Sequence, residues 1–141
     1  MPARCRPAHD KHYHLREPFG YLLTLDLYGC RPCVCDDLNL CYDFLVDLVR
    51  DLGMTAQGPP HIYRSPPEFP DKAGLSGWIG MIESGIQIHT LTPRSFISID
   101  IYCCRDFTSD GVTEFVRDYF GGCREIEMNR ILRGMKYNEV V

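Results

Sequence analysis

This chain of 141 residues lacks both a membrane-spanning segment and an excess of positive charge. No apolar run approaches the roughly 20 residues needed to cross a bilayer, and the start of the chain has no apolar segment like that of an export signal. Positive charge is not in excess either, since 15 basic residues face 19 acidic ones and are scattered along the chain. We therefore expect a cytoplasmic protein that binds neither membranes nor nucleic acid.

Cysteine, by contrast, is abundant, and its eight copies raise the question of disulfides or a metal. Disulfide frameworks belong mainly to small exported domains, whereas a chain of this length with 45% hydrophobic residues can form a core without them. The spacing Cys30-x2-Cys33-x-Cys35 resembles half of a zinc site. No second well-spaced ligand pair follows, and Cys41 falls on the apolar side of a predicted helix. We expect free thiols and no metal.

The chain reads as one domain with two short extensions. Residues 1–18 contain three prolines and mixed charges without any period, which predicts an irregular arm. The arm contains three histidines, to which we assign no role: His9, His12 and His14. The domain itself should span residues 19–134, followed by a tail over residues 135–141.

Apolar periodicity predicts the order of the secondary-structure elements. Alternating apolar residues indicate strands, a spacing of three and four indicates helices, and glycine or proline marks the breaks. The predicted strands are 19–28, 54–56, 61–63, 76–83, 85–91, 95–104 and 124–132, and two helices should begin at Asp36 or Asp37 and at Ser109 or Asp110. This order argues for an α+β fold, a two-layer α/β sandwich with helices on one face of a mostly antiparallel sheet.

The most informative segment is Glu83-Ser84-Gly85-Ile86-Gln87-Ile88-His89-Thr90, which places a serine after a carboxylate and five residues before a histidine. A serine hydroxyl can attack the carbonyl of the preceding residue and convert the peptide bond into an ester, when a histidine nearby handles the protons. Elimination at Ser84 would then cut the chain and leave a pyruvoyl group. The alternative is an ordinary apolar strand in which the spacing of Ser84 and His89 arises by chance.

The geometry of such a strand sets a condition on this chemistry. Ser84 and His89 differ in parity, so a regular strand would direct them to opposite faces. Gly85 lies where a bend would be needed to bring the two side chains together, and glycine tolerates backbone conformations closed to other residues. A plain bulge at Gly85 would give the same local shape.

Two adjacent cysteines at the end of the predicted strand 95–104 should face opposite layers. Cys103 continues a stripe of isoleucines and is most simply a small core residue. Cys104 shares the other face with polar residues. There its thiol is either a proton donor or an inert half-buried group.

Several short motifs together resemble the short prokaryotic type of S-adenosylmethionine decarboxylase, a pyruvoyl enzyme of polyamine synthesis. The resemblance covers residues 19–134. The matching segments are Leu25-Asp26-Leu27-Tyr28-Gly29-Cys30, Leu75-Ser76-Gly77, Glu83-Ser84-x-Ile86-x-Ile88-His89-Thr90 and Asp100-Ile101-Tyr102-x-Cys104. Their order and mutual spacing also fit the family, which is more specific than any single motif.

The resemblance implies that the chain cuts itself between Glu83 and Ser84. Ser84 would become the pyruvoyl group, which condenses with a substrate amine as a Schiff base. His89 and Ser76 would assist the self-processing, and Cys104 would protonate the α-carbon after carbon dioxide leaves. The family implies S-adenosylmethionine as substrate, spermidine synthesis as pathway, no metal, and a homodimer of cleaved chains.

The chain departs from the family at positions that recognise the substrate. The family usually continues after His-Thr with Trp-Pro-Glu, whose glutamate holds the ribose hydroxyls, whereas this chain has Leu91-Thr92-Pro93. The family's histidine directly after the serine is Gly85 here. Asp26, Glu68 and Asp71 are conceivable substitutes for the glutamate. These departures leave open a pyruvoyl decarboxylase of another small cationic amino acid, such as ornithine or arginine, or a relative without activity.

Overall fold

The computed structural model describes residues 17–139. The histidines of the expected N-terminal arm (His9, His12 and His14) lie outside the described residues, as do residues 140 and 141 of the expected tail. Within the described range, no helix is both long and apolar enough to cross a membrane.

Between residues 17 and 139 the chain forms six strands and three α-helices. The strands are β1 (Gly20–Tyr28), β2 (His61–Arg64), β3 (Leu75–Met81), β4 (Ser84–Leu91), β5 (Phe96–Cys103) and β6 (Glu125–Arg133). The helices are α1 (Pro32–Cys35), α2 (Leu38–Asp51) and α3 (Ser109–Tyr119), with short 3-10 turns at Pro70–Lys72, Thr92–Arg94 and Tyr137–Glu139.

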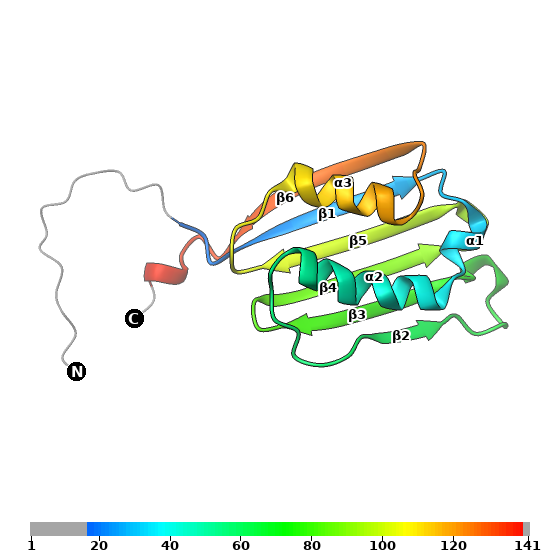
Figure 1. Cartoon of the computed structure of the whole chain (residues 1–141), viewed down its shortest axis with the longest axis horizontal. Coiled ribbons are helices and arrows are strands. Elements are labelled where there is room, and N and C mark those ends of the chain that lie inside the picture. Colours follow the sequence, from blue (N-terminus) through cyan, green and yellow to red (C-terminus); the bar gives the residue numbers. More distant parts are fainter. Residues whose placement is uncertain (1–16, 140–141) are drawn as a thin grey trace, which may run out of the picture.

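All six strands form one sheet in the order β2-β3-β4-β5-β1-β6, and every neighbouring pair is antiparallel. Figure 1 shows α2 and α3 lying across the same face of this sheet. The predicted α+β class and two-layer arrangement are therefore confirmed. We call the face opposite α2 and α3 the open face.

The core lies between the sheet and the helices. Alternate residues of the central strands β1, β4 and β5 are fully buried there, and α2 and α3 add their apolar sides. The largest fully buried side chains include Leu23, Leu25, Leu27, Phe44, Leu45, Leu48, Ile86, Ile88 and Phe120. On the open face the same strands carry the residues of opposite parity, which are mainly polar or aromatic.

The boundaries of the two predicted helices follow the expected signals. The Asp37 side chain accepts a hydrogen bond from the backbone N–H of Leu40 at 3.0 Å, which caps the start of α2. Gly53, with a φ of 66°, follows its end. Helix α3 is followed by Gly121, whose φ is also positive at 73°.

Three local features differ from the predictions. The short helix α1 was not expected, because four residues give no period to recognise. The predicted strand 54–56 is only an isolated bridge between Ala56 and Met81. The break between the next two predicted strands comes earlier than expected, so that β3 ends at Met81 and β4 already includes Ser84 and Gly85.

The cysteines between residues 17 and 139 are all free thiols. Cys30, Cys35 and Cys41 are buried, whereas Cys33 is exposed. A hydrogen bond between the Cys30 and Cys35 side chains raises the pKa of the Cys30 thiol. No cluster of three or more histidine, cysteine or acidic side chains within the described residues is arranged to hold a metal ion.

Candidate active site

The predicted cleavage site lies in a tight hairpin. Met81 at the end of β3 pairs with Ser84 at the start of β4, so that only Ile82 and Glu83 form the turn. Ser84 has a φ of 137°, which residues with a side chain rarely adopt. Such conformations cost on the order of 1–3 kcal/mol and cluster at functional sites. The strained residue is thus the serine itself.

The prediction of a bend at Gly85 is wrong. Gly85 continues the strand and pairs with Gly80 on β3 and with Tyr102 on β5, and its φ is not in the positive range. Hairpins with short turns commonly place a positive φ at or beside the turn. In this hairpin that conformation falls on Ser84 rather than on the glycine after it.

Two hydrogen bonds hold Glu83 next to the predicted cleavage point. Its carbonyl oxygen, which the serine hydroxyl would attack, accepts a hydrogen bond from the backbone N–H of Cys104 at 2.8 Å. Glu83 as a whole is only 7% exposed, and its Oε2 accepts a hydrogen bond from the backbone N–H of Thr55 at 3.0 Å. A donor on the carbonyl oxygen stabilises negative charge that develops there during attack. The carbonyl of the peptide bond before Ser84 is therefore polarised, and the residue that follows the bond has a strained backbone conformation.

Ser76 and His89 lie together on the open face but away from Ser84. They are direct cross-strand partners, and the Ser76 hydroxyl is 2.9 Å from His89 Nδ1. His89 lies five residues along β4 from Ser84, which at about 3.3 Å per residue is a distance of about 16 Å. Within one chain, His89 therefore does not reach the Ser84 hydroxyl.

The adjacent cysteines at the end of β5 have different surroundings, as predicted for Cys103. Cys103 is fully buried, and burial raises the pKa of its thiol to about 12, with smaller effects from Cys104 and Glu83. Cys104 follows the strand and is half-buried. Because its backbone N–H binds the Glu83 carbonyl, Cys104 is the cysteine that lies beside the Glu83–Ser84 peptide bond.

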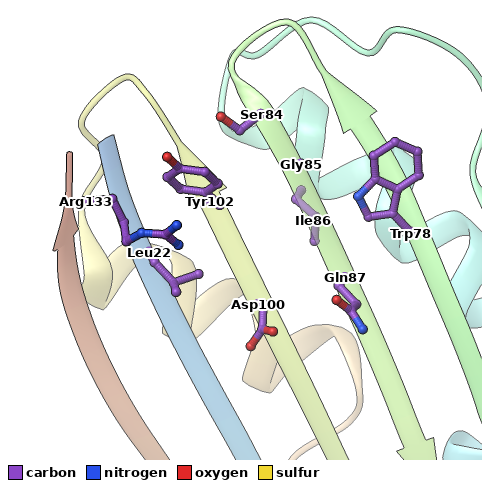
Figure 2. A pocket seen from close by; sticks show the side chains of 9 residues that line it. All are labelled: Leu22, Trp78, Ser84, Gly85, Ile86, Gln87, Asp100, Tyr102 and Arg133. Carbon is purple, nitrogen blue, oxygen red and sulfur yellow. The ribbon is translucent and has the colours of Figure 1, made fainter. Parts of the chain in front are cut away.

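A cavity of about 360 Å³ opens beside Ser84 on the open face (Figure 2). Its aromatic and polar walls come from β3, β4, β5 and β6: Trp78, Gln87, Asp100, Tyr102 and Arg133. Figure 2 shows Ser84 and Tyr102 toward one end of the cavity and Asp100 and Gln87 toward the other. The Arg133 guanidinium lies 4.9 Å from the centre of the Tyr102 ring.

None of these five cavity residues is among the predicted site residues, and three of them carry a charge or an indole ring: Trp78, Asp100 and Arg133. Alternation alone places Trp78 and Asp100 on the polar faces of their strands, but strand register is needed to bring them beside Ser84. Arg133 enters from the edge strand β6, which is far away in the sequence. No sequence pattern indicates that contact.

The departures from the family pattern also map onto the structure. Leu91-Thr92-Pro93 begins seven residues along β4 from Ser84, a distance of about 23 Å at about 3.3 Å per residue. None of the conceivable substitutes for the missing glutamate lines the cavity at Ser84. Asp26 lies on the open face in the same row of paired residues as His89, because both pair with Ser98. Glu68 and Asp71 lie between β2 and β3.

Asp26 is also in a negatively charged neighbourhood. Burial, followed by the nearby carboxylates of Glu127 and Asp100, raises the pKa of Asp26. Glu127 pairs with Asp26 across β1 and β6, and its carboxylate accepts a hydrogen bond from the Tyr28 hydroxyl. The open face therefore carries negative charge from Asp100 toward the His89 end of the sheet.

Comparisons with known proteins agree with one another. The sequence model of the family described as S-adenosylmethionine decarboxylase matches residues 21–134. A protein of Clostridium botulinum (strain Langeland), named S-adenosylmethionine decarboxylase proenzyme, is 29% identical over 116 residues, which cover 82% of this chain and 94% of that protein. A protein of the same name from Caldanaerobacter subterraneus subsp. tengcongensis is 25% identical over 70% of this chain and 76% of its own length.

A solved structure shows the same fold. The crystal structure of the adenosylmethionine decarboxylase from Aquifex aeolicus superposes with a TM-score of 0.71 and covers 84% of this chain and 92% of that chain. The two sequences are 22% identical. This likeness supports the arrangement of strands and helices described above.

Proposed function

The chain belongs to the S-adenosylmethionine decarboxylase family, and we propose that it is a self-processing carboxy-lyase whose pyruvoyl group forms from Ser84. We assign this activity to a domain of residues 19–134. The observation that carries the proposal is the Glu83–Ser84 bond, which combines a positive φ at the serine with a hydrogen-bonded carbonyl on the residue before it. This local geometry fits the chemistry that would generate the group.

The proposed self-processing is a sequence of balanced steps. The Ser84 oxygen attacks the carbonyl carbon of Glu83, the C–N bond breaks, and the serine nitrogen takes up a proton, which gives an ester. Elimination then removes the α-proton of Ser84 and expels the Glu83 carboxylate. Addition of water and loss of ammonia leave a ketone at the new amino end. The Cys104 backbone N–H supports the first step, because it already binds the carbonyl oxygen.

In the proposed decarboxylation, the pyruvoyl group supplies an electron sink for the amine-bearing carbon of the substrate. The chain's own residues would bind the substrate, exclude water and return a proton. We propose Cys104 as the proton donor, since it lies beside the Glu83–Ser84 bond whereas Cys103 points into the core. Cys104→Ala should therefore be cleaved but should release little carbon dioxide.

We propose S-adenosylmethionine as the substrate, because the named relatives carry that activity in their names. Spermidine synthesis is the pathway that the family resemblance implies. A second candidate is a smaller cationic amino acid, ornithine or arginine. It is favoured by one observation, that Pro93 stands where the family has the glutamate for the ribose. Carbon dioxide release from the three labelled substrates distinguishes the candidates.

We also propose a homodimer of cleaved chains. The cavity that Ser84 lines and the Ser76–His89 pair lie toward opposite ends of the open face, and Ser84 and His89 are about 16 Å apart along β4. A twofold axis through this face would place His89 of the partner subunit at Ser84, and the reverse contact would form at the same time. The dimer would thereby reconcile a processing role for His89 with its distance from Ser84.

Intact-mass analysis tests the self-processing. Purified protein should appear as two chains, one ending at Glu83 and one beginning with a pyruvoyl group that reacts with a hydrazine reagent. Ser84→Ala should remain a single chain. Ser95→Ala is the matched control, because Ser95 is the other non-glycine residue between 17 and 139 with a positive φ, at 51°. It should be cleaved like the wild type. A wild-type chain that stays whole would refute the proposal.

A further inference from the structure

Trp78 is seated in a shallow recess formed by two glycines. Gly80 and Gly85 face each other across β3 and β4, on the open face beside Ser84. A Cβ added at Gly85 would lie 2.9 Å from Trp78 Nε1, and one added at Gly80 would lie 2.9 Å from Trp78 Cη2. The indole thus occupies the space that side chains at both positions would need.

A second contact holds the indole from the other side. His61 on β2 pairs with Trp78, and their rings stack with centroids 6.4 Å apart and planes 24° apart. Trp78 is nevertheless 50% exposed and lines the cavity beside Ser84. An aromatic ring that is fixed on two sides and open on a third forms a rigid wall for a ligand.

The two charged groups of this cavity lie toward opposite ends. Arg133 on β6 pairs with Gly20 on β1. This pair is next to the row of paired residues that contains Ser84 and Cys103, on the side away from Asp100. Asp100 lies three positions from Cys103 along β5, which is about 10 Å at about 3.3 Å per residue. Neither Asp100 nor Arg133 takes part in an ion pair with another residue of the described part of the chain.

We infer that Asp100 and Trp78 are the specificity-determining residues of this cavity, and that together they bind a positively charged group several bonds away from the α-carbon of the substrate. The inference rests on the proposed function, which places the reacting amine at Ser84. A side chain extending from that point passes between the Trp78 indole and the Tyr102 ring and ends near Asp100 (Figure 2). Indole faces and carboxylates both attract a positively charged group.

The charge at the other end of the cavity supports the same orientation. The Arg133 guanidinium lies against Tyr102, which is at the Ser84 end of the cavity, and it repels a cation from that end. It attracts the carboxylate of an amino acid whose amine is at Ser84. A sulfonium, an ammonium and a guanidinium all carry the positive charge that Asp100 would recognise. The test therefore uses a separate pair of ligands, one charged and one uncharged, for each of these three groups.

The first experiment measures discrimination between charged and uncharged analogues. Wild-type protein should bind S-adenosylmethionine more tightly than S-adenosylhomocysteine if the cation is a sulfonium, or arginine more tightly than citrulline if it is a guanidinium. Ornithine and norleucine form the corresponding pair for an ammonium. Asp100→Asn should reduce the preference for the charged member of the active pair about 10- to 100-fold, because a charge-assisted contact is lost.

Asp43→Asn is the matched control, since it removes one negative charge from an exposed residue of α2 on the other side of the sheet. It should leave the preference unchanged. The inference is overturned if Asp100→Asn keeps the full preference for the charged ligand or if both variants change it equally. Failure of the proposed function would appear differently, as wild-type protein that is not cleaved and releases no carbon dioxide, and it would remove the basis of the inference.

The second experiment uses the fact that Trp78 is the only tryptophan of the chain. Its fluorescence reports directly on the cavity wall, so binding of the preferred charged ligand should change the emission. Trp78→Ala should lower kcat/KM for that substrate, whereas Trp78→Phe, which keeps an aromatic face, should restore most of the activity. Self-cleavage should continue in both variants. Unchanged fluorescence with saturating ligand, or equal activity of the alanine variant, would contradict a wall at Trp78.

Discussion

Backbone strain alone does not distinguish the proposed cleavage site in this protein from other positions. Ser84 and Ser95 both have a positive φ, at 137° and 51°, and both lie next to a turn. Only the bond before Ser84 is flanked by a glutamate whose carbonyl and carboxylate are both held, by Cys104 and by Thr55. Strain raises the energy of the uncut chain, and the hydrogen bond to the carbonyl lowers that of the tetrahedral species. This combination is found at Ser84 and is the reason for proposing it as the cleavage site.

The cysteines allow a test of which thiols are available for chemistry. Burial raises the pKa of Cys41 and of Cys103 to about 12. A raised pKa keeps a thiol protonated at pH 8, and only the thiolate reacts quickly with alkylating reagents. We expect iodoacetamide at pH 8 to label exposed Cys33 and half-buried Cys104, while Cys41 and Cys103 stay unmodified.

Peptide mapping by mass spectrometry measures this pattern. Urea-unfolded protein is the control, in which all four thiols should react because burial no longer protects them. Labelling of native Cys103 at a rate similar to that of Cys104 would show that the two side chains do not face different layers. Loss of carbon dioxide release in parallel with labelling of Cys104, in a variant with Cys33→Ser, would support its proposed role as proton donor.

Among the secondary-structure elements, those with a strong period were predictable and the short ones were not. Helix α2 has both a capping aspartate and an apolar stripe, and it forms within two residues of the predicted start. Helix α1 and the bridge at Ala56 have neither, because they depend on contacts with distant segments. The alternation in β5 correctly assigned Cys103 to the core. What alternation could not supply was strand register, and therefore the grouping of Trp78, Asp100 and Arg133 beside Ser84 was not predictable.

The β3–β4 hairpin gives a prediction about Gly85. Gly85→Ala would place a methyl group 2.9 Å from Trp78 Nε1 and 3.2 Å from the backbone oxygen of Ile79. Because the φ of Gly85 is not positive, alanine suits the backbone, and the indole must move instead. We expect a shifted Trp78 emission and a several-fold change in KM, with self-cleavage retained.

Gly58→Ala is the control for this variant, because a Cβ at Gly58 meets no atom within 4 Å. It should leave both the emission and KM unchanged. Circular dichroism would confirm that both variants keep the fold. If Gly85→Ala left the emission and KM at their wild-type values, the indole would not be seated on this glycine.

At the scale of the whole molecule, the open face carries the groups of the proposed chemistry but separates them. Ser84 and its cavity lie at one end of β4, and the hydrogen-bonded pair of Ser76 and His89 lies toward the other. Large side chains are also exposed on this face, including Tyr63 at 70% and Trp78 at 50%. Exposed aromatic residues around a functional cavity are typical of a surface that contacts another protein. A second copy of the chain would cover them and complete the site.

Subunit mixing tests this arrangement directly. Ser84→Ala cannot be cleaved but keeps His89, whereas His89→Ala keeps Ser84 but lacks the histidine. If His89 acts on the partner subunit, His89→Ala alone should stay uncleaved, and coexpression with a tagged Ser84→Ala chain should restore cleavage of the His89→Ala chain. Mass spectrometry of the purified mixed dimer identifies which chain was cut, and coexpression of His89→Ala with a Ser84→Ala, His89→Ala double variant controls for dimer formation.

Cleavage of His89→Ala by itself would show that the histidine is not needed. An uncut His89→Ala chain in a mixed dimer that does form would show that His89 does not act across the subunits.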